Sequence, residues 1–343
     1  MQPVSLEDLL EGAVSVERGD GWIKPWRLPF PLLKLFPPDD GIAMRGEDAA
    51  GVRLRFTTDS PRLELEVLPV RQPRLFDLTA DGQLMRTVTL EPGDSVVVFD
   101  DDLSTDDAPL EIWLPNTHPV GLQELRVVAG ARLEPVADRR LKWITYGSSI
   151  SQCGAAHSPA RTWPGVVARD RNLNLTCLGY SGQCHLEPMV ARMIRDLEAD
   201  VITLKLGINV QGGATLSGRT LRPAVIGMVQ IIRERHPDTP IVIVSPIISP
   251  PREDQPNAVG MSLGVLRAQL EDAVERMEDL GDGHIHYVDG LEVFGEEFVG
   301  RLPDLLHPDA EGYEILGQRM SQIVMGSTPI ARALGAPETG GAR

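Results

Sequence analysis

Short segments of alternating apolar and polar residues dominate the chain before residue 140. In residues 62–68, Leu63, Leu65 and Val67 alternate with Glu64 and Glu66, which is nearly the period of two that a half-buried strand shows. Similar segments lie at residues 51–58, 84–90, 95–99, 110–114 and 122–128, and turn-forming clusters rich in Asp, Pro and Gly separate them. This spacing predicts an all-β sandwich of the jelly-roll type over residues 1–138. Residues 22–40 are rich in proline and aromatic residues, which predicts no long regular element there.

The pattern changes near residue 140, where buried-type strands begin to alternate with amphipathic helices. Strands are expected at residues 141–146, 173–178, 200–206, 240–244 and 284–288, and helices at 159–169, 185–198, 221–236, 262–279 and 310–323. This alternation predicts an α/β domain over residues 139–330, with a parallel sheet between helix layers. The glycine- and proline-containing tail, residues 331–343, is expected to be disordered.

Charge and composition narrow the class of protein. A net charge of −16 argues against partners rich in phosphate, both nucleic acid and anionic membrane surfaces. No apolar run is long enough to span a bilayer, and the first residues are acidic rather than basic and apolar, so we expect a cytoplasmic protein; secretion with a leader removed stays open. The three cysteines form neither a disulfide framework nor a zinc pattern. For Cys153 and Cys184, small buried packing residues, a nucleophile or a redox link all stay open.

Candidate chemistry lies in the loops that follow the strands of the second domain. In parallel α/β sheets, active sites form at the carboxyl ends of strands. Ser149 follows the first strand, Gly182 the second and Asn209 the third, while Asp304 and His307 follow the last. Taken singly, a serine is often a helix cap, a glycine or asparagine a turn residue, and a histidine a surface residue. Together they offer a nucleophile, donors for an oxyanion and a base with a carboxylate three residues away.

These segments resemble the conserved blocks of the SGNH/GDSL esterases. Residues 147–150 (GSSI) are similar to the Gly-Asp-Ser-Leu block, Gly182 to the block-two glycine, residues 207–209 (GIN) to the Gly-x-Asn-Asp block, and residues 304–308 (DLLHP) to Asp-x-x-His-Pro. The resemblance covers residues 141–325 and implies a three-layer, flavodoxin-like domain. The preceding stretch resembles the β-sandwich found before the catalytic domain in some carbohydrate esterases. Ser148 and Val210 depart from the pattern, because the family has aspartate at both positions.

The resemblance implies a carboxylic ester hydrolase with Ser149, Asp304 and His307 as its triad. The backbone N–H groups of Ser149 and Gly182 and the Asn209 side chain would then hold the oxyanion, and no metal or cofactor is expected. The expected substrates are short-chain acyl esters, above all acetyl esters, of a sugar or small metabolite. An acyltransferase with the same triad and a carbohydrate-binding protein with a vestigial site are the alternatives. Acyl length, alcohol and oligomeric state stay open.

Overall fold

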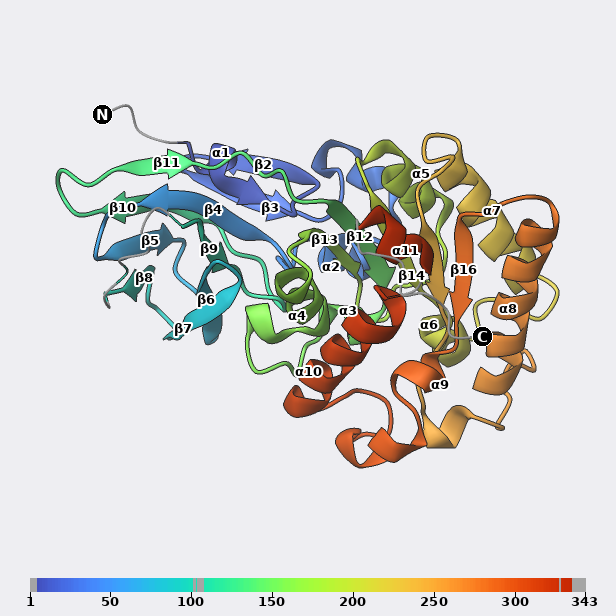
Figure 1. The fold of residues 1–343 in the computed structure, drawn as a ribbon. Helices are drawn as coiled ribbons and strands as arrows, with labels where there is room; N and C mark the ends of the chain where they lie inside the picture. Colours follow the sequence, from blue (N-terminus) through green and yellow to red (C-terminus); the bar gives the residue numbers. More distant parts are fainter. Residues whose placement is uncertain (1–4, 101–102, 104–107, 327, 335–343) are drawn as a thin grey trace. The chain divides into compact units, whose positions relative to one another are not determined.

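The computed structural model describes residues 5–100, 103, 108–326 and 328–334, and Figure 1 shows its helices and strands. The chain divides into two compact units. The first contains residues 1–140 and 156–177, and the second contains residues 141–155 and 178–343. The division at residue 140 lies two residues beyond the boundary expected from sequence. The segment 156–177, which the sequence assigned to the second domain, groups with the first unit.

The first unit is built from two sheets of antiparallel strand pairs, in line with the predicted sandwich. One sheet has the order β1 (Leu10–Glu11), β4 (Arg53–Thr58), β9 (Leu110–Trp113), β6 (Arg74–Ala80) and β7 (Gln83–Leu90), with β11 (Leu133–Pro135) also paired to β4. The other has the order β2 (Ser15–Gly19), β3 (Trp22–Trp26), β10 (Leu122–Val127), β5 (Leu63–Val67) and β8 (Val96–Phe99).

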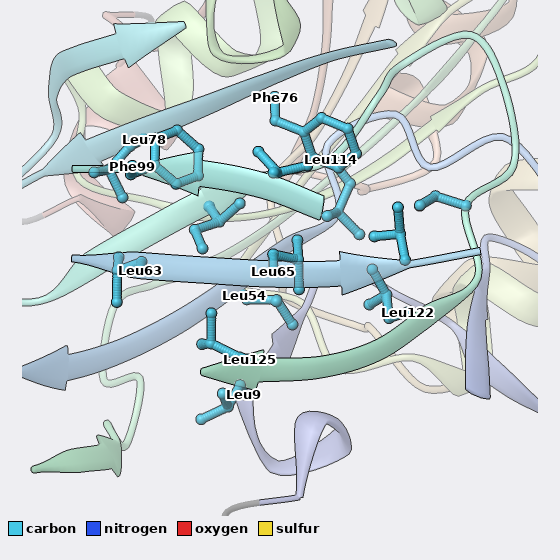
Figure 2. Packing of buried hydrophobic residues seen from close by; sticks show 14 of the residues in the cluster. Leu9, Leu54, Leu63, Leu65, Phe76, Leu78, Phe99, Leu114, Leu122 and Leu125 are labelled. Atoms are coloured by element: carbon cyan, nitrogen blue, oxygen red, sulfur yellow. The ribbon is translucent and has the colours of Figure 1, made fainter. Parts of the chain in front are cut away.

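Buried apolar side chains from both sheets form a single core cluster. In β5 the three apolar residues are buried and the two glutamates are half-buried, so the alternation in the sequence corresponds to the inner and outer faces of the strand. Figure 2 shows Leu63 and Leu65 of β5 in the same cluster as Phe76 and Leu78 of β6. Burial of alternate residues from both sheets is the main stabilising contribution to such a sandwich.

A buried charge network also belongs to this unit. The Glu111 carboxylate is within 3.3 Å of Arg53, 3.1 Å of Arg55 and 2.7 Å of Arg140. Burial raises the pKa of Glu111, but the three guanidinium groups outweigh burial and lower it below its usual value. Glu111 therefore stays ionised and compensates cations that could not otherwise be buried.

Residues 22–40 contain β3 and a 3-10 helix, Phe30–Leu35, so no long regular element forms there, as predicted. The strand β3 itself was not predicted. Pro25 is tolerated in it because β3 pairs with β10 at Ile23, before the proline, so the missing N–H removes no bond to β10. The helix predicted at 159–169 is divided by Thr162, which has extended backbone. It forms a 3-10 helix (Pro159–Arg161) and α4 (Trp163–Asp170).

The second unit carries the predicted α/β architecture. Its sheet has the order β13 (Asn174–Gly179), β12 (Lys142–Gly147), β14 (Val201–Lys205), β15 (Ile241–Val244) and β16 (Ile285–Val288). The first four residues of β13 belong to the segment 156–177, which groups with the first unit. The pairs β12–β14, β14–β15 and β15–β16 are parallel. The helices α7 (Leu221–Arg233) and α8 (Leu263–Asp279) pack side by side, and α8 lies against β16 (Figure 1). Shorter elements follow the strands: α3 (Ser149–Gln152), α5 (Pro188–Asp196), α6 (Ile208–Gly213) and α9 (Gly290–Val293).

Three predicted segments of this unit differ in detail. The helix predicted from residue 185 begins only at Pro188, because Leu186 has a φ of +62° that no α-helix accommodates. The last predicted helix, 310–323, is α10 (Ala310–Arg319) continued by a π-helical turn, Met320–Val324. The tail expected to be disordered starts inside α11 (Thr328–Ala333), and residues 335–343 lie outside the described residues. Among the residues described, no helix is both long and apolar enough to cross a membrane.

Candidate active site

Ser149 lies at the start of α3, directly after β12. Ser148 is the N-cap of this short helix, and its side-chain oxygen accepts a hydrogen bond from the N–H of Ile150 at 3.2 Å. The Ser149 hydroxyl instead lies 2.8 Å from Nε2 of His307, which is 158 positions further along the chain. Of the two neighbouring serines, Ser149 is therefore the one that contacts the imidazole. Ser148, the residue that replaces the family's aspartate, is buried and caps the helix.

The loop from Asp304 to His307 orients the imidazole. Asp304 Oδ1 accepts hydrogen bonds from the N–H of Leu306 at 3.0 Å and of His307 at 2.7 Å, and Oδ2 lies 2.7 Å from His307 Nδ1. Leu305 has a φ of +57°, and its carbonyl accepts a hydrogen bond from the Ser249 hydroxyl at 2.7 Å, which holds this strained backbone. Because the carboxylate only accepts, we assign the proton of neutral His307 to Nδ1, and Nε2 then accepts from Ser149.

The charge on Asp304 is stabilised by this loop. Partial burial raises the pKa of Asp304, but hydrogen bonds from the His307 side chain and from the N–H groups of His307 and Leu306 outweigh burial and lower it from 3.8 to about 2. Asp304 is therefore ionised over the whole range in which most enzymes work. An ionised carboxylate in this place stabilises an imidazolium on His307.

Gly182 occupies a tight turn after β13. The N–H of Gln183 donates to the carbonyl of Tyr180 at 3.0 Å, and Gly182, the third residue of this turn, has a φ of +73°. A positive φ at this position is what a type II turn requires and what favours glycine there. The turn is also held by the Gln152 side chain, whose oxygen accepts from the N–H of Ser181 at 2.9 Å.

Asn209 lies at the second position of α6, in the loop after β14. Its Oδ1 accepts a hydrogen bond from the N–H of Cys184 at 3.0 Å, so its Nδ2 group is directed elsewhere. The sequence left open what supports Asn209, because Val210 replaces the aspartate of the family pattern. In the structure this support comes from the backbone of the Cys184 segment, which the sequence did not indicate.

Three N–H groups of this region have no hydrogen-bond partner within the described parts of the chain. They are the backbone N–H of Ser149, the backbone N–H of Gly182 and the Asn209 side-chain amide. The first residue of a helix has no intrahelical acceptor for its N–H, which explains the case of Ser149. No group within the described residues accepts a hydrogen bond from these three donors, so each can donate to a negative oxygen of a ligand.

The three cysteines Cys153, Cys177 and Cys184 are buried free thiols, so Cys153 and Cys184 are not linked in the structure. Burial raises the pKa of the Cys184 thiol, with a further contribution from the negative charge of Glu187. A thiol with a raised pKa is a poor nucleophile at neutral pH. The packing interpretation of Cys184 is therefore favoured over the nucleophilic one.

Two polar residues of this region were missed by the sequence interpretation. Ser249 holds the Leu305 carbonyl, and His185 contacts both Gly182 and Thr215. His185 follows Gly182 by three positions in the same loop, which was a weak signal because histidines in loops are commonly solvated. Ser249 lies 56 residues before Leu305, so no local pattern relates the two.

A parallel α/β sheet that bears a serine, histidine and aspartate in hydrogen-bonded series defines a class of serine-dependent acyl-ester enzymes. Residues 141–324 match the GDSL-like lipase/acylhydrolase family, and residues 9–123 match the SsfX3 N-terminal domain. The chain belongs to the GDSL-like lipase/acylhydrolase family. This confirms the family expected from the motifs at residues 147–150, 207–209 and 304–308.

Solved structures agree with this assignment. The salicylyl-acyltransferase SsfX3 from a tetracycline biosynthetic pathway is 36% identical, with a TM-score of 0.85 and coverage of 94% of this chain and 95% of that chain. A Bacteroides ovatus structure described as a GDSL-like lipase is 22% identical, with a TM-score of 0.73 and coverage of 97% and 98%. A family two carbohydrate esterase mutant from Clostridium thermocellum is 12% identical, with a TM-score of 0.66 and coverage of 93% and 98%. The last two show the fold alone. None of the curated proteins compared with this chain matches it.

Proposed function

We propose that this protein is a serine esterase that hydrolyses short-chain acyl esters of a sugar or small metabolite through an acyl-enzyme on Ser149. The observation that carries this proposal is the series of contacts from Ser149 Oγ to His307 Nε2, 2.8 Å, and from His307 Nδ1 to Asp304 Oδ2, 2.7 Å. Within this series the serine has a base in reach, and the base has an orienting anion.

In the first half of the reaction, Ser149 Oγ forms a bond to the ester carbonyl carbon while His307 Nε2 takes the serine proton. Asp304, ionised at all working pH values, stabilises the imidazolium that results. The bond from the carbonyl carbon to the alcohol oxygen then breaks, and His307 gives its proton to the leaving alcohol. In the second half, water attacks the acyl-enzyme by the same route, and Ser149 is regenerated together with a carboxylic acid.

The tetrahedral intermediates carry a negative oxygen, for which the N–H groups of Ser149, Gly182 and Asn209 are the proposed donors. Their lack of other partners within the described residues supports this role, because a donor already engaged would have to break a bond first. The Cys184 N–H fixes the Asn209 amide before substrate arrives, so little reorganisation is needed during the reaction.

A small apolar gap lies among the chain neighbours of these residues. It has no room for even a water molecule, so it is packing space and not a pocket that holds an acyl group. The lining residues include the chain neighbours of Ser149, Asn209 and His307; they are Ile150, Ile208, Pro246, Ile247, Ile248, Ser249 and Leu306. The short acyl chain of the proposal therefore rests on the family resemblance and not on this gap.

The test is a panel of p-nitrophenyl esters from acetyl upward, run on the wild-type protein, Ser149→Ala and Ser148→Ala. We expect the activity of the wild type to fall with acyl chain length. Ser149→Ala should abolish activity. Ser148→Ala should keep it, because the wild-type Ser148 hydroxyl caps a helix and does not attack the ester. A fluorophosphonate should label the wild type and Ser148→Ala but not Ser149→Ala. A wild-type protein that neither hydrolyses any ester nor reacts with the fluorophosphonate would refute the proposal and favour the carbohydrate-binding alternative.

Acyl transfer is the second candidate, and the 36% identity to a salicylyl-acyltransferase over nearly the whole chain favours it. The two reactions share the acyl-enzyme and differ in whether water or an alcohol attacks it. Products should therefore be quantified with increasing concentrations of candidate alcohols, sugars among them. A new ester that forms at the expense of the free acid, with unchanged release of p-nitrophenol, identifies a transferase.

A further inference from the structure

We propose that His185 is a positioning residue for the oxyanion-binding groups of this site, and the inference rests on the proposed function. His185 lies in the loop between Gly182 and α5 and is half-buried. Its Nε2 lies 3.0 Å from the carbonyl oxygen of Gly182, and its Nδ1 lies 3.0 Å from the hydroxyl oxygen of Thr215. One imidazole thus joins the turn that bears Gly182 to the segment that follows Asn209.

The partners determine which ring nitrogen carries the proton. A backbone carbonyl can only accept, so Nε2 must be the donor to Gly182. In the neutral ring Nδ1 is then an acceptor, and the Thr215 hydroxyl donates to it. This tautomer is the opposite of the one assigned to His307, where the carboxylate of Asp304 holds the proton on Nδ1. The two imidazoles of this region are therefore distinguishable by experiment.

The connection matters because the proposed donors come from separate segments. The N–H of Gly182 and the Nδ2 group of Asn209 must converge on a single oxygen, and donors displaced by a fraction of an ångström lose much of their effect. Gly182 has no side chain, and a Cβ placed there would meet nothing within 4 Å, so no neighbouring group packs on that face of the residue. The carbonyl of Gly182 is instead held by the hydrogen bond from His185.

Two further hydrogen bonds support the segment that contains Asn209. The N–H of Cys184, the residue before His185, donates to Asn209 Oδ1, and the N–H of Thr215 donates to the carbonyl of Val210 at 3.3 Å. Adjacent residues of one loop therefore hold both ends of the Asn209 segment. Loss of the imidazole would leave Asn209 with its own bond but would free the Gly182 carbonyl and the Thr215 hydroxyl.

The experiment compares kcat and KM for p-nitrophenyl acetate in the wild type, His185→Ala, His185→Gln and Thr215→Val. The control is His284→Ala, an exposed histidine that directly precedes β16, at the opposite end of the strand from the site. We expect His185→Ala to lower kcat about 10- to 100-fold. This decrease is no larger than the one that follows removal of a whole oxyanion donor. KM and the melting temperature should stay near the wild-type values, and His284→Ala should behave as wild type.

Glutamine can donate from its amide nitrogen to the Gly182 carbonyl, so the kcat of His185→Gln should lie nearer to wild type than to His185→Ala. Thr215→Val keeps the shape of the side chain but loses its hydroxyl, and a smaller decrease in kcat is expected. An unchanged kcat in His185→Ala would overturn the inference. So would a decrease that glutamine does not rescue and that follows a lower melting temperature, because that result indicates a purely structural role.

Failure of this inference can be separated from failure of the proposed function. Ser149→Ala, run in the same assay, shows whether hydrolysis depends on the proposed nucleophile. The tautomer gives a readout without activity: ¹⁵N NMR of histidine-labelled protein, with the His185 signal identified by its absence in His185→Gln. A neutral ring protonated at Nε2 is expected, whereas a ring protonated at Nδ1 cannot donate to Gly182 and would overturn the inference.

Discussion

Lys205, the last residue of β14, is only 2% exposed, and the structure suggests that its charge destabilises the folded protein. Burial lowers its pKa from 10.5 to about 8, against the opposing effect of the nearby Cys184 and Cys153 thiols. The positive charge of Arg267 lowers this pKa further, and within the described part of the chain no carboxylate is among the groups that shift it. We predict that Lys205→Met, which replaces the ammonium by an apolar side chain of similar length, increases the free energy of unfolding at neutral pH.

The magnitude follows from the two pKa values. A difference between 10.5 and about 8, at about 1.4 kcal/mol for each pKa unit, corresponds to about 3 kcal/mol. Below pH 8 both the folded and the unfolded protein hold the proton, so the full cost of the buried charge is present. Between pH 8 and 10.5 the folded protein binds fewer protons than the unfolded one, so the stability of the wild type rises with pH. Above 10.5 the cost is absent.

Urea denaturation followed by circular dichroism, at pH 7 and again near pH 10.5, measures this effect. Lys205→Met should exceed the wild type by up to about 3 kcal/mol at pH 7, and the difference should shrink at the higher pH. The control is Lys34→Met, which alters an exposed lysine and should give a small difference at both pH values. A Lys205→Met variant that is less stable than wild type at pH 7, or a gain independent of pH, would refute the reasoning.

Three further predictions concern the two units separately. Glu111→Gln should lower the free energy of unfolding by about 3 kcal/mol at neutral pH, because it leaves buried arginines uncompensated. The difference in stability from wild type should shrink at acid pH, where Glu111 of the wild type is itself protonated. Urea denaturation at two pH values measures this difference. Asn209→Asp keeps the acceptor for the Cys184 N–H but removes the proposed donor, so kcat for p-nitrophenyl acetate should fall about 100-fold or more with the fold intact; unchanged kcat would exclude the amide from the oxyanion site. Asp304, with a pKa lowered to about 2, stays ionised as pH falls through 4, so its protonation should not contribute to the acid limb of the wild-type pH–rate profile above about pH 3. Asp304→Asn should lower kcat by about three to four orders of magnitude at every working pH, and a variant that recovers wild-type rates at any pH would contradict the assigned role.

Much of the architecture could be predicted from local patterns. The alternation of leucine and glutamate in residues 63–67 became the inner and outer faces of β5, because a strand directs successive side chains to opposite faces. The five buried-type segments after residue 140 became the strands of one sheet, and β14 and β15 are buried at every residue, as expected for central strands covered on both faces. The residue types of the site, and the strand ends they follow, were also readable from the chain, because chemistry restricts which side chains act as nucleophile, base and donor.

Only the tertiary structure decided how these groups meet. The motif at residues 147–150 selected Ser149, but only the structure shows that His307, 158 residues away, contacts the hydroxyl of Ser149. Nor could the sequence indicate that the N–H of Cys184 supports Asn209, or that His185 contacts Gly182 and Thr215. Local patterns follow from the periodicity of helix and strand. Contacts between distant segments depend instead on how the loops pack and on which backbone groups still need a hydrogen-bond partner. A single sequence does not record either of these two factors.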